Sequence, residues 1–88
     1  MSRTFKEVLE RKEFIEQNTS LETWKLLGKM VQIKKNKKGG IEVTYREKEI
    51  IKKEAGDFEM YITKFRGFLR TSNELLMILN IFERGIEG

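Results

Sequence analysis

Four lysines lie within five positions of the sequence, in the segment Lys34-Lys35-Asn36-Lys37-Lys38. Ammonium groups this close repel one another, which favours a solvated segment or one that lies against an anion. The chemistry they offer is therefore electrostatic: they can bind phosphate groups such as those along a nucleic acid. A solubilising turn on a basic protein is the plainer interpretation of the same four lysines.

Other kinds of chemistry find little support in the residue types. The chain has no His and no Cys, which excludes disulfides, thiolate chemistry, the common zinc sites and every His-based triad. It contains neither GxxxxGK[ST] nor GxGxxG. Four N-terminal glutamates recur three apart, and such a row fans round a helix instead of converging on an ion. We therefore expect no enzyme activity, no metal and no cofactor.

The net charge of +4 is unevenly distributed along the chain. Residues 23–70 hold thirteen basic and six acidic side chains, a net +7, whereas residues 1–22 and 71–88 have net charges of −1 and −2. Such a concentration of positive charge favours polyanionic partners. The predicted phosphate contacts are the four clustered lysines, with a possible extension from other basic residues of this region; the full set is Lys25, Lys29, Lys34, Lys35, Lys37, Lys38, Lys52, Lys53, Arg66 and Arg70.

The clustered lysines lie between two predicted strands. Residues 30–33 and 41–46 are rich in β-branched and aromatic residues, and the second segment alternates so that Ile41, Val43 and Tyr45 would face a core. Asn36 and the pair Gly39-Gly40 supply the backbone conformations of a tight reversal. The pattern predicts a β-hairpin whose loop carries the lysines.

A third strand is predicted over residues 58–65, after a reversal at Ala55-Gly56-Asp57. The alternation that begins at Ile41 breaks after Tyr45, so we expect a bulge or bend near residues 47–49. Tyr61 and Phe65 would share the outer face of the third strand with cations nearby, an arrangement that suits nucleic-acid contact and equally suits a sheet covered on both faces.

Three capping-box patterns predict helices. Thr4…Glu7 begins an expected helix over residues 4–16, and Thr19…Glu22 begins a short one that ends at Gly28. Trp24 is expected in the core, and its neighbours Lys25 and Lys29 leave open a role as a stacking surface beside a basic edge. Thr71…Glu74 begins the last helix, with Gly85 as its stop.

The last helix is apolar at seven of the eight positions 75–82. Such a helix either lies centrally, with the N-terminal helices on its far side, or presents an apolar face to a second copy or another protein. The candidate residues of that partner interface are Leu76, Met77 and Ile81.

The expected fold is a single small α+β domain over residues 1–88, in the order ααβββα: N-terminal helices, a three-stranded antiparallel meander with a basic hairpin loop, and an apolar C-terminal helix. This order is similar to the α-β-β-β-α chain of the double-stranded-RNA-binding domain, which has a similar size. That family presents lysines at the start of its last helix, where this chain has Thr71-Ser72-Asn73-Glu74. The similarity therefore concerns element order alone.

Two functions follow as expectations. The first is a small non-catalytic module that binds nucleic-acid phosphates, DNA or RNA, through the lysine-rich hairpin and without sequence-specific readout. The second is a protein-interaction factor, such as a small inhibitor or adaptor of the kind mobile elements encode, which uses the apolar last helix or the basic hairpin against an acidic partner. No signal peptide or membrane-spanning run is apparent, so we expect a soluble cytoplasmic protein without membrane attachment.

Overall fold

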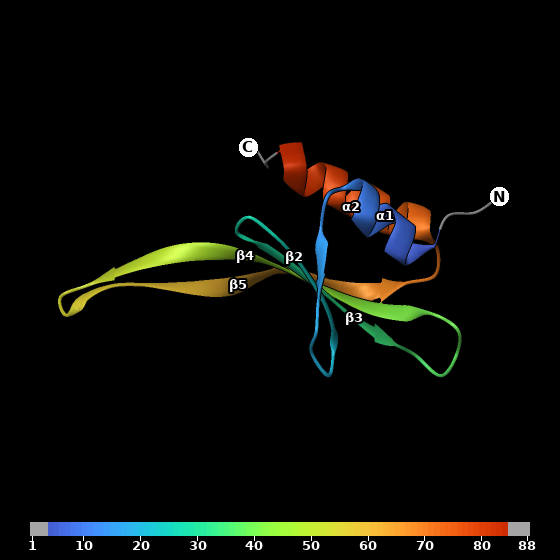
Figure 1. Ribbon diagram of the computed structural model, residues 1–88, viewed down its shortest axis with the longest axis horizontal. Coiled ribbons are helices and arrows are strands. Elements are labelled where there is room, and N and C mark those ends of the chain that lie inside the picture. Colours follow the sequence, from blue (N-terminus) through green and yellow to red (C-terminus); the bar gives the residue numbers. More distant parts are fainter. Residues whose placement is uncertain (1–3, 85–88) are drawn as a thin grey trace.

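The computed structural model describes residues 4–84, and its single sheet contains five antiparallel strands, not the expected three. The strands pair in chain order as a meander, with β1 and β5 at the edges. The expected ααβββα order is therefore wrong, and so is the likeness in element order to the double-stranded-RNA-binding domain. The observed elements are α1 (Phe5–Arg11), β1 (Ile15–Gln17), β2 (Glu22–Leu26), β3 (Lys29–Lys35), β4 (Ile41–Lys53), β5 (Gly56–Leu69) and α2 (Ser72–Arg84) (Figure 1).

The first helix begins where its capping box predicts but is shorter than the expected helix over residues 4–16. Thr4 Oγ1 accepts a hydrogen bond of 3.1 Å from the backbone N–H of Glu7. The helix ends at Arg11, and Glu13 then adopts a φ of 68°, a left-handed conformation that redirects the chain. The residues that follow pair with β2 as the short edge strand β1.

The second expected helix, over residues 19–28, is wrong, because this segment forms β2 and the turn into β3. The spacing of Leu21, Trp24 and Leu27 matches a helix, yet Leu27 lies in the turn with 97% of its surface exposed. Gly28 has a φ of 76°, so it serves this β-turn and not a helix C-cap. The prediction that Trp24 belongs to the core is confirmed, since only 2% of it is exposed.

The predicted hairpin is confirmed: β3 and β4 pair antiparallel with Ile33 opposite Val43. The predicted irregularity near residues 47–49 is wrong, because β4 continues unbroken to Lys53. The bulge lies instead on β5. Tyr45 pairs with Phe65 and the next residue of β4 pairs with Thr63, which leaves Lys64 as the extra residue.

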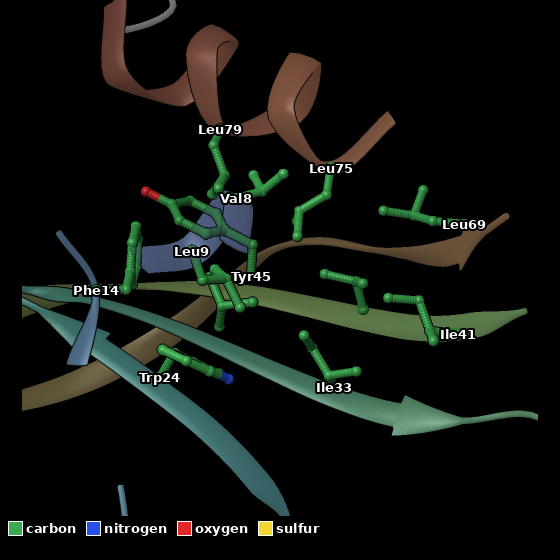
Figure 2. Close-up of a cluster of buried hydrophobic side chains, with 12 residues drawn as sticks. Val8, Leu9, Phe14, Trp24, Ile33, Ile41, Tyr45, Leu69, Leu75 and Leu79 are labelled. Carbon is green, nitrogen blue, oxygen red and sulfur yellow. The ribbon is translucent and has the colours of Figure 1, made fainter. Parts of the chain in front are cut away.

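Both helices lie on one face of the sheet, and the core fills the space between these two layers (Figures 1 and 2). Tyr45 of β4 stacks on Phe82 of α2 with ring centroids 4.5 Å apart, which joins the centre of the sheet to the last helix. The buried apolar residues of this core are Val8, Leu9, Phe14, Trp24, Val31, Ile33, Ile41, Val43, Tyr45, Leu69, Leu75 and Leu79.

The last helix begins as its capping box predicts, because Thr71 Oγ1 accepts a hydrogen bond of 3.4 Å from the Glu74 N–H. The predicted stop at Gly85 lies outside the described residues. Leu75 and Leu79 face the sheet and are buried. The apolar surface of this helix is therefore divided between the core and an exposed side, described below.

A side chain of the α1–β1 connection fixes α2 beside the first helix. Lys12 Nζ donates to Asn80 Oδ1 at 2.5 Å and forms an ion pair of 2.7 Å with Glu83. The hydrogen bond from this ammonium group and its charge lower the pKa of the Glu83 carboxyl. No helix within residues 4–84 is long and apolar enough to cross a bilayer.

The β4–β5 hairpin extends beyond the rest of the sheet as a two-stranded arm (Figure 1). The pairing of β3 with β4 stops at the pair Lys29–Glu47, whereas β4 and β5 remain paired as far as Lys53 and Gly56. This arm, residues 48–62, accounts for much of the 51 Å length of the molecule.

Candidate nucleic-acid interface

The β3–β4 connection holds the four clustered lysines at one end of the sheet. The loop is closed by the Asn36 N–H, which donates to the Gly40 carbonyl at 2.9 Å. Asn36 Oδ1 accepts from the Lys38 N–H at 3.2 Å, and Gly39 adopts a φ of 91° that few other residues tolerate. The backbone of the loop is thus ordered by its own hydrogen bonds while the lysines project from it.

We call Lys34, Lys35, Lys37 and Lys38 the lysine tip. All four are exposed, and none forms an ion pair with an acid among residues 4–84. The acid nearest to them along the sheet is Glu42, which pairs with Lys34 across the strands and is engaged by Arg66 at 2.6–2.7 Å. The tip therefore retains its positive charge.

Phe68 lies beside the lysine tip and is 69% exposed. Its neighbour across β4 is Glu42, whose other neighbour is Lys34, so the three side chains form one row across the sheet. This row borders a shallow hollow of about 390 Å³, which is lined by Lys34, Lys35, Asn36, Lys37, Glu42 and Phe68. The hollow combines one aromatic surface with three cations.

The row belongs to the face of the sheet opposite the helices, which we call the open face. Because side chains alternate along a strand, the neighbours of the buried Ile33, Val43 and Leu69 point to this face. A second hollow, of about 310 Å³, lies next to the first one and shares Lys34 and Glu42 with it. Its lining is Leu21, Gln32, Ile33, Lys34, Glu42, Thr44, Arg46, Thr63 and Arg66.

Arginine side chains on the open face are held in place by hydrogen bonds. Arg46 donates to Gln32 Oε1 and, at 3.1 Å, to Thr63 Oγ1. Further along the same face, Lys25 lies over the ring of Tyr61 at 5.6 Å from its centroid. Cations and aromatic rings thus extend from the lysine tip toward the base of the β4–β5 arm.

The fold brings only part of the predicted basic set together. Arg70 directly follows β5, whose last residue pairs with the start of β4, so it lies at the same end as the lysine tip. Arg66 lies on the open face but shares its charge with Glu42. Lys25 lies on the open face near Tyr61.

The remaining predicted cations lie elsewhere. Lys52 and Lys53 are at the end of the β4–β5 arm, at the opposite end of the long axis from the lysine tip (Figure 1). Lys53 lies over the ring of Phe58 at 5.1 Å. Lys29 borders a hollow on the helix side, where its charge contributes to the lowered pKa of Glu83.

The three predicted partner-interface residues separate into two kinds. Leu76 is partly buried and packs against the core. Met77 and Ile81 are 63% and 53% exposed on the outer side of α2, four residues apart and so on one helix face.

The sequence does not identify Phe68 as a site residue, because the third predicted strand ends at residue 65, whereas β5 continues to Leu69. The sequence pattern also places Phe65 beside Tyr61 on the outer face. The extra residue Lys64 in the bulge reverses the alternation, so Phe65 packs against the core instead. The signal that could have revealed Phe68 is its place directly before Leu69, because adjacent residues of a strand point to opposite faces.

Two ion pairs lie on the arm and at its base. Lys48 and Glu59 lie 2.8 Å apart, and Lys64 and Glu49 lie 2.5 Å apart. These hydrogen bonds raise the pKa of both lysines. Within residues 4–84, no group of three or more acidic residues could hold a metal ion.

Comparison of the chain with protein-family models, with curated proteins and with solved structures finds no match.

Proposed function

We propose that this chain is a small non-catalytic binding module that contacts nucleic-acid phosphates at the lysine tip, without sequence-specific readout. The observation that supports this most is the group of four exposed lysines on one ordered hairpin loop, none paired with an acid among residues 4–84. Nucleic acid is abundant in the cytoplasm, which is where we expect the protein to act.

The local charge supports a polyanionic ligand. Residues 34–42 and 66–70 contain six basic side chains and one acid, a net charge of +5. Each phosphate that these groups neutralise releases counterions, so affinity falls by about 0.7–0.9 log units per log unit of salt for every phosphate neutralised. Lysines act on phosphates as point charges, which position a nucleic acid but do not read its bases.

Two lysine pairs at opposite ends of the molecule provide a matched test. Lys37→Ala with Lys38→Ala removes two positive charges from the lysine tip, and Lys52→Ala with Lys53→Ala removes two from the end of the arm. In anisotropy titrations with a labelled oligonucleotide, we expect the first variant to bind more weakly, with a salt slope lower by about 0.7–0.9 for each phosphate that is no longer neutralised. We expect the second variant to bind like the wild type.

Equal reductions of affinity in the two variants would show that only net charge matters and would reject the lysine tip as the site. Absence of wild-type binding at low salt would reject nucleic-acid binding itself.

A second candidate function is contact with a protein partner, as expected of a small inhibitor or adaptor. The observation that favours it is the exposure of Met77 and Ile81 on one face of α2. Light scattering over a range of concentrations tests the version in which the partner is a second copy of this chain.

A further inference from the structure

We infer that the open face binds single-stranded nucleic acid. One unpaired base stacks on Phe68, and the phosphate backbone of the strand lies next to the lysine tip. This inference rests on the proposed function and names the class of nucleic acid that the site accepts. The Phe68 ring is exposed and does not belong to the buried core.

Phe68 is 69% exposed although it lies in a strand, directly before the buried Leu69. Its surroundings are charged or polar: the other residues that line its hollow are Lys34, Lys35, Asn36, Lys37 and Glu42. The cores of protein–protein interfaces are depleted of Lys and Glu, which surround this ring. A nucleotide instead supplies a flat aromatic base for the ring and a phosphate for the lysines.

The ring selects against duplexes. Bases within a double helix are already stacked on one another and paired, so a ring on the surface of a strand reaches their faces only if the stack is opened at an energetic cost. An unpaired base is free to stack on a phenyl ring, and such contacts tolerate any sequence because every base has an aromatic face. Exposure of the Phe68 ring beside unpaired lysines therefore favours a single strand.

The second hollow gives the strand a path along the sheet. It adjoins the first hollow at Lys34 and Glu42, and it contains the guanidinium groups of Arg46 and Arg66 with the hydroxyl of Thr63. These groups can donate hydrogen bonds to phosphates and base edges. Beyond them lies a second aromatic ring, Tyr61, with Lys25 over it at 5.6 Å.

The path ends near Tyr61. Farther out on the arm the open face carries opposite charges next to each other, with Lys48 paired to Glu59 at 2.8 Å and Lys52 opposite Asp57 across the strands. The β4 partners of Phe68 and Tyr61 are Glu42 and Lys48, which are six residues apart, and this corresponds to roughly 20 Å at about 3.3 Å per residue. This length fits the short end of the known range of single-strand sites, about 4–16 nucleotides.

The experiment compares oligothymidine and oligouridine of twelve nucleotides with a twelve-base-pair duplex, using wild type, Phe68→Ala and the control Phe58→Ala. Phe58 is also an exposed aromatic residue of β5 but lies on the distant arm. We expect wild type to prefer the single strands. Phe68→Ala should bind them about 5–150-fold more weakly with little change in salt slope, whereas Phe58→Ala should bind like wild type.

A further variant, Phe68→Trp, reports stacking directly. Its new indole is exposed whereas Trp24 is buried, so quenching of the exposed fluorescence by the single strand indicates base contact. Preference of the wild type for either single strand over the duplex supports the inference. Thermal unfolding of each variant confirms that its fold is intact.

The two proposals fail in different ways. If Phe68→Ala binds both single strands as tightly as wild type while the Lys37→Ala, Lys38→Ala variant is impaired, the base-stacking inference is overturned and the phosphate-binding function stands. Equal wild-type affinity for duplex and single strands also overturns it. If no nucleic acid binds at low salt, both proposals are wrong.

Discussion

Tyr45 shows how a single residue links the layers of this small fold. Its ring is 1% exposed and stacks on Phe82, and its hydroxyl donates a 3.0 Å hydrogen bond to a carboxylate oxygen of Glu47. Burial raises the pKa of the Tyr45 phenol, and the hydrogen bond to Glu47 and its charge raise it further. Folding therefore favours the neutral phenol.

This raised pKa predicts an alkaline decrease in stability. In the unfolded chain Tyr45 would release its proton near the usual value of 10.0. The folded state keeps the proton, so the free energy of unfolding falls as the pH rises above that value. We expect Tyr45→Phe to cost about 0.5–1.5 kcal/mol at pH 7 because the hydrogen bond to Glu47 is removed. The difference from wild type should shrink above pH 10.

Chemical denaturation at several pH values checks this, with Tyr61→Phe as the matched removal of the other phenol. Tyr61→Phe should retain the alkaline decrease of the wild type. Tyr45→Phe should show a smaller decrease, which comes from other groups such as Lys48 and Lys64, whose pKa values are also raised in the fold. Parallel pH profiles of wild type and Tyr45→Phe would contradict this role of Tyr45.

Individual core residues were predictable because their alternation was regular. Ile41, Val43 and Tyr45 follow one another at a spacing of two and are all buried. Phe65 was not predictable in the same way, because the bulge at Lys64 shifts the alternation by one residue. The signal for that bulge is a pairing across two strands, which a local sequence pattern does not contain.

At the scale of elements, the main error concerns residues 15–26. Trp24 and Leu26 face inward at the two-residue spacing of a strand, but Leu21, Trp24 and Leu27 also match a helix. Pairing with the regular strand β3 decides in favour of β2, and β2 in turn pairs with the three-residue β1. Tertiary pairing thus overrides the local pattern.

The β4–β5 arm provides a prediction at this scale. Its strands pair only with each other beyond Glu47, and most of its side chains are exposed. Two-stranded ribbons of this kind are marginally stable alone. We expect hydrogen exchange of arm amides to proceed through local opening, much faster than that of the amides between β3 and β4, which exchange on global unfolding.

Denaturant dependence separates the two regimes. The exchange rates of arm amides should be nearly independent of denaturant at low concentrations. The exchange rates of the amides that pair β3 with β4 should rise with denaturant concentration. Equal protection in both regions would mean that the arm is as stable as the sheet.

At the scale of the whole molecule, the fold redistributes the charge that the sequence concentrates in residues 23–70. Successive connections of an antiparallel meander lie at opposite ends of the sheet. Lys37 and Lys38 therefore lie at one end and Lys52 and Lys53 at the other (Figure 1). The net charge of +7 in this region is evident from the sequence. The separation of its lysines between two ends of the molecule is not, because that separation depends on strand lengths and order.

The most direct test of the proposed interface is NMR mapping on uniformly labelled full-length protein, titrated with a single-stranded oligonucleotide at low salt. We predict that amide shift changes concentrate in the β3–β4 loop and around Phe68, and continue along the open face toward Tyr61. The end of the β4–β5 arm and the outer face of α2 should remain unchanged. Changes centred on Met77 and Ile81, or at Lys52 and Lys53, would contradict the interface.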